Sequence, residues 1–584
     1  SVGLNYNILK GLKFSSTYSL DHYFTRVYTF TPDYLKYDKK SEVQASNIAM
    51  TNIQTENILT YNLALPSEHK LELMAGMTYN YDLLQNLSGT AKGGPTNSIK
   101  YAGEGWPSLF NDGGTVRAAQ SFLTNQQEQS LLSFLGRAAY SYKKRYMAEL
   151  SIRADGSSVF GKDVRWGTFP SVGLGWAFSE EHFMKKFWWL SFGKLRASWG
   201  KSGQKFQEPY LALGVMEESN IFNGSLGLIP QSMANKKLTW EESDQYDLGL
   251  DLQMLDYRLK LKLDYYYKYS SKLLMQSYLP GNVFLATNMW DNASAISNEG
   301  IEFEAQYDVI RKKNWNWSVG FNLSHNKNML RKTYNGEDLN DKVLGRPVYG
   351  IYTFKDEGIV QKEEDIPMYL NASGKQIPLY FQSINNPLRV GGRKIKDQNY
   401  DGVIDDKDLY YAGSTLPAVY GGLNSHLEWK GLSFDVLFSY TISRKVMNMY
   451  KNSAFTFTKD FGVIMNYFHA GDFWTTSNRD AKYPSLEFAD KDYVGQFDGN
   501  VDSNIENISF LRLKQLVIGY QIPKNWLKGS FIKDANVYLS GENLFLLTNY
   551  SGVDPEIINP YSGKDDGTQY PLNRKVTLGL NLKF

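Results

Sequence analysis

The last nine residues of the 584-residue chain, Val576–Phe584, alternate between apolar side chains at even positions and polar side chains or glycine at odd positions. Successive side chains of a β-strand point to opposite faces, so this segment would form a strand with one apolar and one polar face. Its length is close to that of a tilted strand that crosses a lipid bilayer. The pattern favours a membrane-spanning strand, and the alternative is the last strand of a soluble sheet.

The same two-residue alternation recurs along the whole chain, with charged side chains on one face and apolar side chains on the other. It is clearest in Leu71–Tyr79, Leu248–Met254, Leu259–Tyr267, Ile301–Val309 and Trp315–Leu323. Strands of about ten residues with this pattern are typical of transmembrane β-barrels. We therefore predict an all-β, antiparallel transmembrane barrel with about 17 strands in this sequence.

The connections between the expected strands are alternately short and long. The long ones are expected at about 83–127, 203–237, 331–415, 447–506 and 550–572. Outer-membrane barrels have short periplasmic turns and long extracellular loops, which places the C-terminus in the periplasm. Counting back, the first strand would descend from the outside. We therefore expect residues 1–584 to be the C-terminal portion of a barrel of about 22 strands, whose plug lies outside this sequence.

Composition excludes several other classes of protein. The net charge is +2, so we expect no nucleic-acid partner. The chain has no cysteine, which excludes disulfides and thiolate metal sites. Aromatic residues make up 15% of the chain, which suits the aromatic girdles of a membrane barrel. No His-Glu-x-x-His pattern and no phosphate-binding glycine loop is present, so we expect no enzymatic activity and no catalytic residue.

Six sequence blocks occur in order along the chain: Arg153–Gly161, Trp166–Trp176, Leu195–Gly200, Phe510–Lys514, Ser540–Phe545 and Tyr550–Glu556. Together they resemble the SusC/RagA family of TonB-dependent outer-membrane transporters of Bacteroidetes. Glycine at strand ends and aromatic residues at interfaces also meet the structural needs of any barrel. The blocks therefore indicate the family and do not identify a substrate site, and the substrate-binding residues stay unassigned.

The resemblance implies a bacterial outer-membrane location and TonB-dependent import of oligosaccharides or peptides. It also implies a SusD-like lipoprotein lid, pairing of two such complexes, contact with outer-membrane lipid, and TonB contact through an N-terminal region absent here. The alternative is a SusC-like structural scaffold subunit of a larger outer-membrane complex. The apolar row Leu578, Leu580, Leu582 and Phe584 resembles the membrane-insertion signal of bacterial outer-membrane barrels.

One twelve-residue segment, Asp397–Asp408, has the oxygen spacing of a calcium-binding loop, with glycine at its sixth position. The expected ligands are Asp397, Asn399, Asp401, Asp405 and Asp408 through their side chains and Val403 through its carbonyl oxygen. Asp408 replaces the usual bidentate glutamate and has a shorter reach. We expect a structural Ca²⁺ that stiffens an extracellular loop. The alternative is an aspartate-rich surface turn that binds no metal.

Overall fold

A computed structural model describes residues 1–584 except 67, 103–105, 108, 113–114, 119, 223–224, 282–287, 340–341, 372, 450–468, 490–499 and 568. The chain divides into two compact units. Unit 1 comprises Ser1–Ala177, Arg196–Tyr246 and Tyr269–Ala295. Unit 2 comprises Phe178–Leu195, Asp247–Lys268 and Ile296–Phe584.

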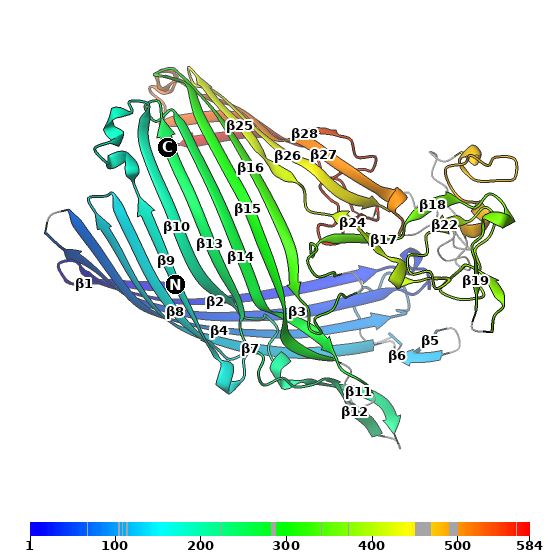
Figure 1. Ribbon diagram of the computed structural model, residues 1–584. Helices are drawn as coiled ribbons and strands as arrows, with labels where there is room; N and C mark the ends of the chain where they lie inside the picture. The colour runs from blue at the N-terminus through cyan, green and yellow to red at the C-terminus, as the bar shows by residue number, and fades with distance from the viewer. Residues whose placement is uncertain are drawn as a thin grey trace. The chain divides into compact units, whose positions relative to one another are not determined.

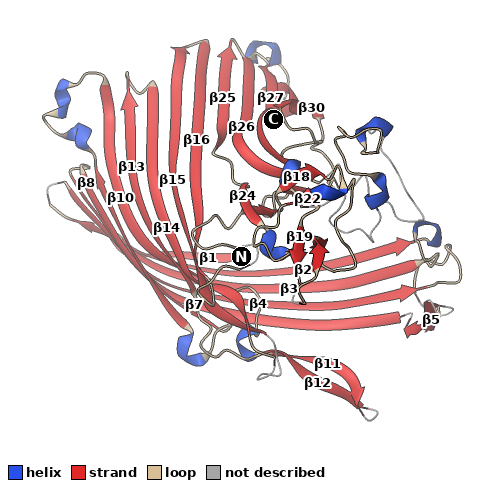
Figure 2. Ribbon diagram, turned by 45° about the vertical axis from the view of Figure 1, so that its right-hand side comes forward, coloured by secondary structure: helices blue, strands red, loops and turns tan. Residues whose placement is uncertain are grey.

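Long strands dominate the chain (Figures 1 and 2). Among the described residues, 18 strands belong to one sheet. They are β1 (Val2–Leu9), β2 (Leu12–Thr31), β3 (Glu42–Ala64), β4 (His69–Lys92), β7 (Gln120–Tyr142), β8 (Tyr146–Ser157), β9 (Trp166–Trp176), β10 (Leu190–Gln204), β13 (Glu241–Met254), β14 (Leu259–Tyr278), β15 (Asn288–Lys312), β16 (Trp315–Lys332), β25 (Val419–Trp429), β26 (Leu432–Asn448), β27 (Ile505–Gln521), β28 (Asp534–Thr548), β29 (Lys564–Asp565) and β30 (Lys575–Lys583). Since β29 has only two residues, the number of long strands agrees with the predicted 17.

The remaining elements are short. The small strands are β5 (Leu109–Asp112), β6 (Thr115–Ala118), β11 (Val215–Phe222), β12 (Ser225–Ser232), β17 (Gly350–Thr353), β18 (Asp356–Ile359), β19 (Met368–Leu370), β20 (Gln376–Pro378), β21 (Tyr380–Phe381), β22 (Arg393–Ile395), β23 (Val403–Ile404) and β24 (Tyr410–Ser414). The 3₁₀ turns are η1 (Asp33–Leu35), η2 (Lys162–Val164), η3 (Phe178–Glu180), η4 (Met184–Lys186), η5 (Leu211–Leu213), η6 (Glu363–Asp365), η7 (Asp406–Asp408), η8 (Ala470–Asp472), η9 (Leu486–Ala489), η11 (Asp502–Asn504) and η12 (Lys524–Leu527). In the described part of the chain, no helix has the length and apolar character needed to cross a membrane.

In unit 1, β2, β3, β4 and β7 form neighbouring antiparallel pairs whose registers run without a bulge. These strands have 20 to 24 residues, about twice the length that a bilayer requires. Segments 83–92 and 120–127, which we predicted as parts of a long loop, instead continue β4 and β7. The prediction ended these strands too early because their extracellular halves are polar and lack an apolar face.

In unit 2, the terminal strand β30 pairs antiparallel with β28 from Lys575 to Lys583. Leu578, Leu580 and Leu582 lie on one face of β30 and are 76%, 58% and 39% exposed, as expected for side chains that face lipid. The Phe584 ring stacks on Phe531 at 5.6 Å between centroids. The size of 22 strands stays a prediction.

The predicted loops 331–415 and 447–506 contain a folded module rather than irregular chain. Four two-stranded sheets pair β17 with β24, β18 with β22, β19 with β20 and β21 with β23. The module has its own hydrophobic core, whose buried members are Val360, Leu379, Phe381, Leu388, Ile395, Ile404 and Val501. Residues 450–468 and 490–499 of the second loop lie outside the described residues.

Candidate functional site

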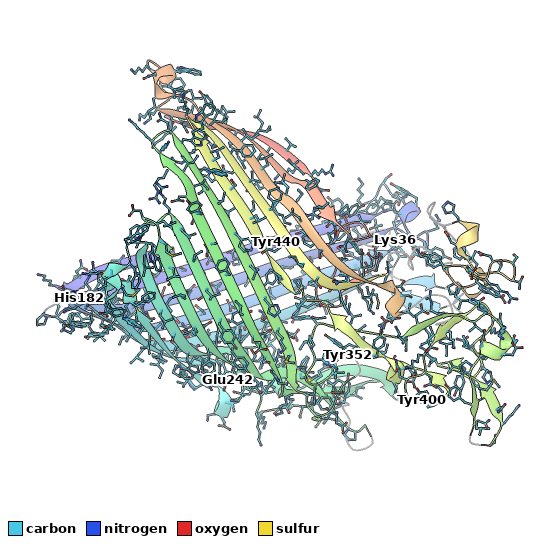
Figure 3. The ribbon with its side chains drawn as sticks, turned by 45° about the horizontal axis from the view of Figure 1, so that its top comes forward. Lys36, His182, Glu242, Tyr352, Tyr400 and Tyr440 are labelled. Carbon is cyan, nitrogen blue, oxygen red and sulfur yellow. The ribbon has the colours of Figure 1, made fainter. Side chains whose placement is uncertain are left out.

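The face of the sheet opposite the apolar rows carries paired charges. Arg137 on β7 donates two hydrogen bonds to Glu149 on β8, at 2.8 and 2.7 Å, and its Nη1 lies 3.4 Å from a Glu72 oxygen on β4. Lys201 and Lys272 both bind Glu242, which Figure 3 labels, at 3.2 and 2.5 Å. These side chains are partly exposed, so the pairs contribute little stability. They instead give the inward face a hydrated lining of both signs.

The first family-like blocks form a packed cluster in unit 1. The Arg153 Nε atom donates to Asp155 at 2.7 Å, and its Nη2 donates to Ser133 at 2.9 Å. A side chain at Gly203 would place its Cβ 2.0 Å from the Phe169 ring, so glycine is required for this close approach. The buried residues Val159, Phe160, Phe169, Phe206, Ala212, Leu238 and Trp240 form the cluster. These blocks therefore have a structural role, as the sequence analysis indicated.

The last family-like blocks meet at a buried charge cluster in unit 2. Arg512 is 3% exposed, and its Nη2 donates to Asp554 at 2.5 Å. Its Nε pairs with Glu556, which also binds the Lys514 ammonium at 2.7 Å. Asp554 further accepts the backbone N–H groups of Glu556 and Leu572, at 3.0 and 3.2 Å. The cluster holds the predicted loop 550–572 against β27.

The predicted calcium loop folds into successive turns closed by carboxylates. Asp397 accepts the N–H groups of Tyr400 and Gly402, at 2.6 and 2.8 Å. Asp408 accepts those of Gln398 and Asp405, at 2.7 and 2.9 Å. The structure therefore brings both ends of the loop together. Gly402 has φ of 85°, and Tyr400, exposed and labelled in Figure 3, has φ of 61°.

The donor chemistry of this loop fits a hard cation. Asp397 and Asp408 are 5% and 0% exposed, and burial raises the pKa of Asp408. Asn399 and Asp401 are exposed, and both Asp405 and Val403 are half-buried. Within the described chain, none of the four expected aspartate ligands has an ion-pair partner, although no group of three carboxylates or histidines converges on one point. The excess of buried negative charge suits Ca²⁺, and the site stays a prediction.

Sequence reasoning missed the long-range contacts that hold this loop and the rest of the module together. Tyr369 lies against Gly402, and burial together with a hydrogen bond to Asp397 raises the pKa of Tyr369 to about 12. Arg393 forms a buried ion pair with Asp356. Asp502 accepts hydrogen bonds from Lys355 and Tyr410, both at 2.6 Å. These partners lie 28 to 147 positions apart in sequence, and no local pattern marks them.

We expect Asp502→Asn to remove an acid-labile contribution to the stability of the module. Burial alone would raise the pKa of Asp502, but hydrogen bonds from Lys355 and Tyr410 outweigh it and hold the pKa below its usual value. A carboxyl with a lowered folded-state pKa stabilises the fold above its unfolded pKa of about 3.9, and loses that contribution as pH falls through the folded value. Limited proteolysis between pH 3 and pH 6 should therefore show a pH-dependent cleavage that the variant flattens.

The exposed Asp480 supplies the control for this experiment. Asp480→Asn should leave the pH profile of cleavage unchanged. An Asp502→Asn profile identical to that of the unsubstituted protein would show that Asp502 does not connect residues 350–360 to residues 500–504.

The alternation of an apolar outer face and a charged inner face, on strands that exceed the bilayer thickness, defines an outer-membrane β-barrel. The family model described as TonB dependent receptor-like, beta-barrel matches residues 1–360. The chain belongs to this family of TonB-dependent receptors, and it is of the SusC/RagA type. Its location is therefore the outer membrane, as predicted, and membership of a receptor family agrees with the expectation of no enzymatic activity.

Individual relatives span the same barrel region. TonB-dependent receptor P26 of Formosa agariphila is 30% identical over 97% of this chain and 57% of its own length. TonB-dependent receptor SusC of Bacteroides thetaiotaomicron is 29% identical over 82% of this chain and 46% of its own. A solved structure of the RagAB peptide transporter superposes with a TM-score of 0.79, at 22% identity, over 99% of this chain and 61% of that one. The chain thus spans about half to three fifths of the relatives it matches.

Proposed function

We propose that the complete protein is an energised importer of oligosaccharides or peptides across the outer membrane, and that residues 1–584 form the wall of its barrel. The observation that carries the proposal is the match of residues 1–360 to the TonB-dependent receptor barrel. The hydrated lining described above supports the proposal. Charges on the wall that are already paired lose less when a large polar cargo displaces their water than unpaired charges would, so the cargo can pass.

The proposed partners follow from the family. A SusD-like lipoprotein would cover the extracellular mouth, and TonB would energise the transport. Two such complexes would pair. Within the described residues, the folded module has its own core and a buried ion pair, and it would form a docking platform for the lipoprotein.

The test is uptake of a fluorescent mixture of oligosaccharides or peptides by cells that express the full-length protein. The proposal predicts accumulation that disappears when TonB is deleted or the proton gradient is collapsed. Accumulation that is equal with and without TonB would contradict it. Recovery of the purified protein with stable partners other than a lipoprotein would instead favour the scaffold alternative.

We also propose that Asp397, Asn399, Asp401, Val403, Asp405 and Asp408 bind a structural Ca²⁺. The ion would supply positive charge to carboxylates that now accept hydrogen bonds from backbone N–H groups, the Tyr369 hydroxyl and the Asn399 amide. Ca²⁺ at about one hundred times its dissociation constant would add roughly 2.7 kcal/mol to the stability of the module.

This proposal predicts that 1 mM Ca²⁺ protects residues 350–415 of the full-length protein from limited proteolysis, and that EGTA reverses the protection. Asp408→Ala should abolish the protection by Ca²⁺. Asp406→Ala is the matched control, because Asp406 is exposed and occupies a non-ligand position of the same loop. Cleavage that does not respond to Ca²⁺, or equal loss of protection in both variants, would contradict the metal site.

A further inference from the structure

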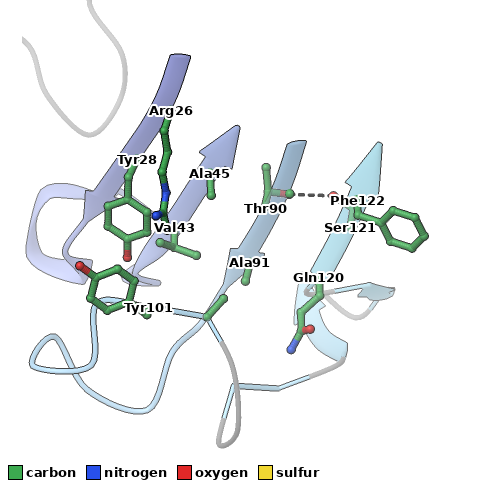
Figure 4. Close-up of a pocket in the computed structure, with 12 residues that line it drawn as sticks. Arg26, Tyr28, Val43, Ala45, Thr90, Ala91, Tyr101, Gln120, Ser121 and Phe122 are labelled. Atoms are coloured by element: carbon green, nitrogen blue, oxygen red, sulfur yellow. Dashed lines mark hydrogen bonds between the residues drawn. The ribbon is translucent and has the colours of Figure 1, made fainter. Parts of the chain in front are cut away.

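A pocket of about 420 Å³ lies in unit 1 where β2, β3, β4 and β7 extend toward the long connections (Figure 4). Its lining residues are Arg26, Tyr28, Val43, Ala45, Gly89, Thr90, Ala91, Tyr101, Ala102, Gln120, Ser121 and Phe122. None of these residues belongs to the family-like blocks, the calcium loop or the charged inner face.

The strand registers place this pocket on the outward face of the sheet. Tyr28 lies opposite Ala45, Ala45 opposite Gly89, and Gly89 opposite Phe122, so the four share one face. The same face of β2 carries Leu20, because positions of equal parity on an unbroken strand point the same way. The pocket therefore opens toward the surroundings of the barrel, and cargo inside the barrel does not reach it.

The pocket lies above the lipid-facing band. The apolar row of β2 begins at Leu12, beside the short turn, and a bilayer accommodates about 9–11 residues of a tilted strand. Tyr28 is eight positions beyond Leu20, which at about 3.3 Å per residue is roughly 26 Å along the strand. Because barrel strands tilt by about 35–45°, this length corresponds to roughly 18–21 Å along the membrane normal, a level that the sugar chains of outer-leaflet glycolipids occupy.

Small residues and a folded-back loop build the pocket. The small residues Ala45, Gly89 and Ala91 line its floor and leave space above the sheet. A Cβ atom at Gly89 would meet only the Ser121 carbonyl oxygen, at 3.5 Å. The loop after β4 forms one wall and is held by two bonds between Asn97 and Asp33, at 2.6 and 3.1 Å. The loop also stacks Tyr101 on Tyr28 with centroids 4.7 Å apart.

Two polar groups in this pocket lack partners within the protein. The Tyr28 hydroxyl is buried and has no hydrogen-bond partner in the described structure. Arg26, whose side chain runs alongside the Tyr28 ring in Figure 4, has no hydrogen bond or ion pair with any described residue. A buried hydroxyl without a partner is costly, and an unpaired guanidinium readily binds carboxylate or phosphate. Exposed aromatic faces at Tyr101 and Phe122 complete the lining.

We propose that this pocket binds an acidic sugar, phosphorylated or carboxylated, of the glycolipid that surrounds the barrel. Arg26 would pair with the acidic group, and the Tyr28 hydroxyl would bond a sugar hydroxyl. The aromatic faces would cover the apolar C–H face of the ring. The membrane-attached glycolipid is the source, because the pocket faces the glycan layer and not the lumen. Such a contact would hold the extracellular wall in the glycan layer.

The test uses the full-length complex in nanodiscs that contain either lipopolysaccharide with a phosphorylated core or lipid A alone. Native mass spectrometry measures the bound glycolipid. We expect lipopolysaccharide to be retained by the unsubstituted protein, and retention to fall about tenfold in Arg26→Ala, since a charge-assisted hydrogen bond to phosphate is lost. Ala45→Trp, which fills the pocket, should give a similar loss. Lipid A retention should be the same in all variants.

Two variants separate ligand binding from structural effects. Tyr28→Phe keeps the stacked ring and removes only the hydroxyl, so it should weaken lipopolysaccharide retention severalfold without lowering stability. Lys13→Ala removes a cation from the opposite face of the same strand and should change nothing. Retention that is independent of Arg26 would overturn the proposal. So would Arg26-dependent binding of the soluble core oligosaccharide by a protein that retains no lipopolysaccharide.

Discussion

Replacement of Arg512 by alanine is expected to destabilise the barrel by about 3–5 kcal/mol, because it removes one partner of a buried ion-pair cluster. Arg512 and Asp554 are 3% and 4% exposed at their side chains. Without the guanidinium, Asp554 would keep only its two backbone donors in a buried site, while Glu556 would still pair with the Lys514 ammonium. The measurement is urea unfolding in detergent. The folded fraction is read from gel electrophoresis, in which the folded barrel shifts position when it is heated.

The control for Arg512→Ala is Lys514→Ala on the same strand. Lys514 pairs with the same Glu556 at 2.7 Å, but its side chain is 31% exposed. A pair of this kind contributes about 0–1 kcal/mol, so this variant should unfold close to the unsubstituted protein. Equal effects of the two substitutions would mean that burial does not set the strength of the cluster, contrary to our account.

Trp240→Ala is expected to cost a further large amount of stability, about 3–5 kcal/mol, through the cavity that it leaves. Trp240 is 4% exposed, and its ring lies 4.8 Å from Phe160 and 5.5 Å from Phe169, measured between centroids. Its Nε1 donates to the Arg165 carbonyl oxygen at 3.0 Å, and the substitution also removes this hydrogen bond.

The surface residue Trp526, which is 73% exposed, is the matched control for Trp240→Ala. Trp526→Ala should change the urea midpoint little, because no cavity forms at an exposed site. A Trp240→Ala protein as stable as Trp526→Ala would show that the cluster of Val159, Phe160, Phe169, Phe206, Ala212, Leu238 and Trp240 does not stabilise unit 1.

The membrane strands could be predicted from sequence because one local rule governs them. Leu71, Leu73 and Met77 must face lipid and Glu72 must face water, so burial requirements appear as a two-residue period. The same rule failed beyond the bilayer, where both faces are wet. The extracellular half of β4, from Leu83 to Lys92, therefore resembled a loop although it continues the pairing with β3 and β7.

The folded module could not be predicted because its contacts are not local. Its core joins Val360, Leu379 and Val501, which share no period. Arg512 and Asp554 lie 42 positions apart, and no spacing rule relates them. A calcium loop could be proposed from the sequence because all its expected ligand positions lie within twelve residues, and the metal site stays a prediction. Tyr369, which hydrogen-bonds Asp397 of this loop, lies outside those twelve residues and carries no such pattern.

The central claim is that alternate residues of one strand face lipid and water, and the absence of cysteine from residues 1–584 makes it directly testable. Single cysteines from Leu71 to Thr78 of β4 can be introduced one at a time into the full-length protein. A membrane-impermeant maleimide should label positions 72, 74, 76 and 78, and a bimane placed at 71, 73, 75 or 77 should be quenched by lipid-attached nitroxide. Labelling and quenching without a two-residue period would contradict the barrel wall described here.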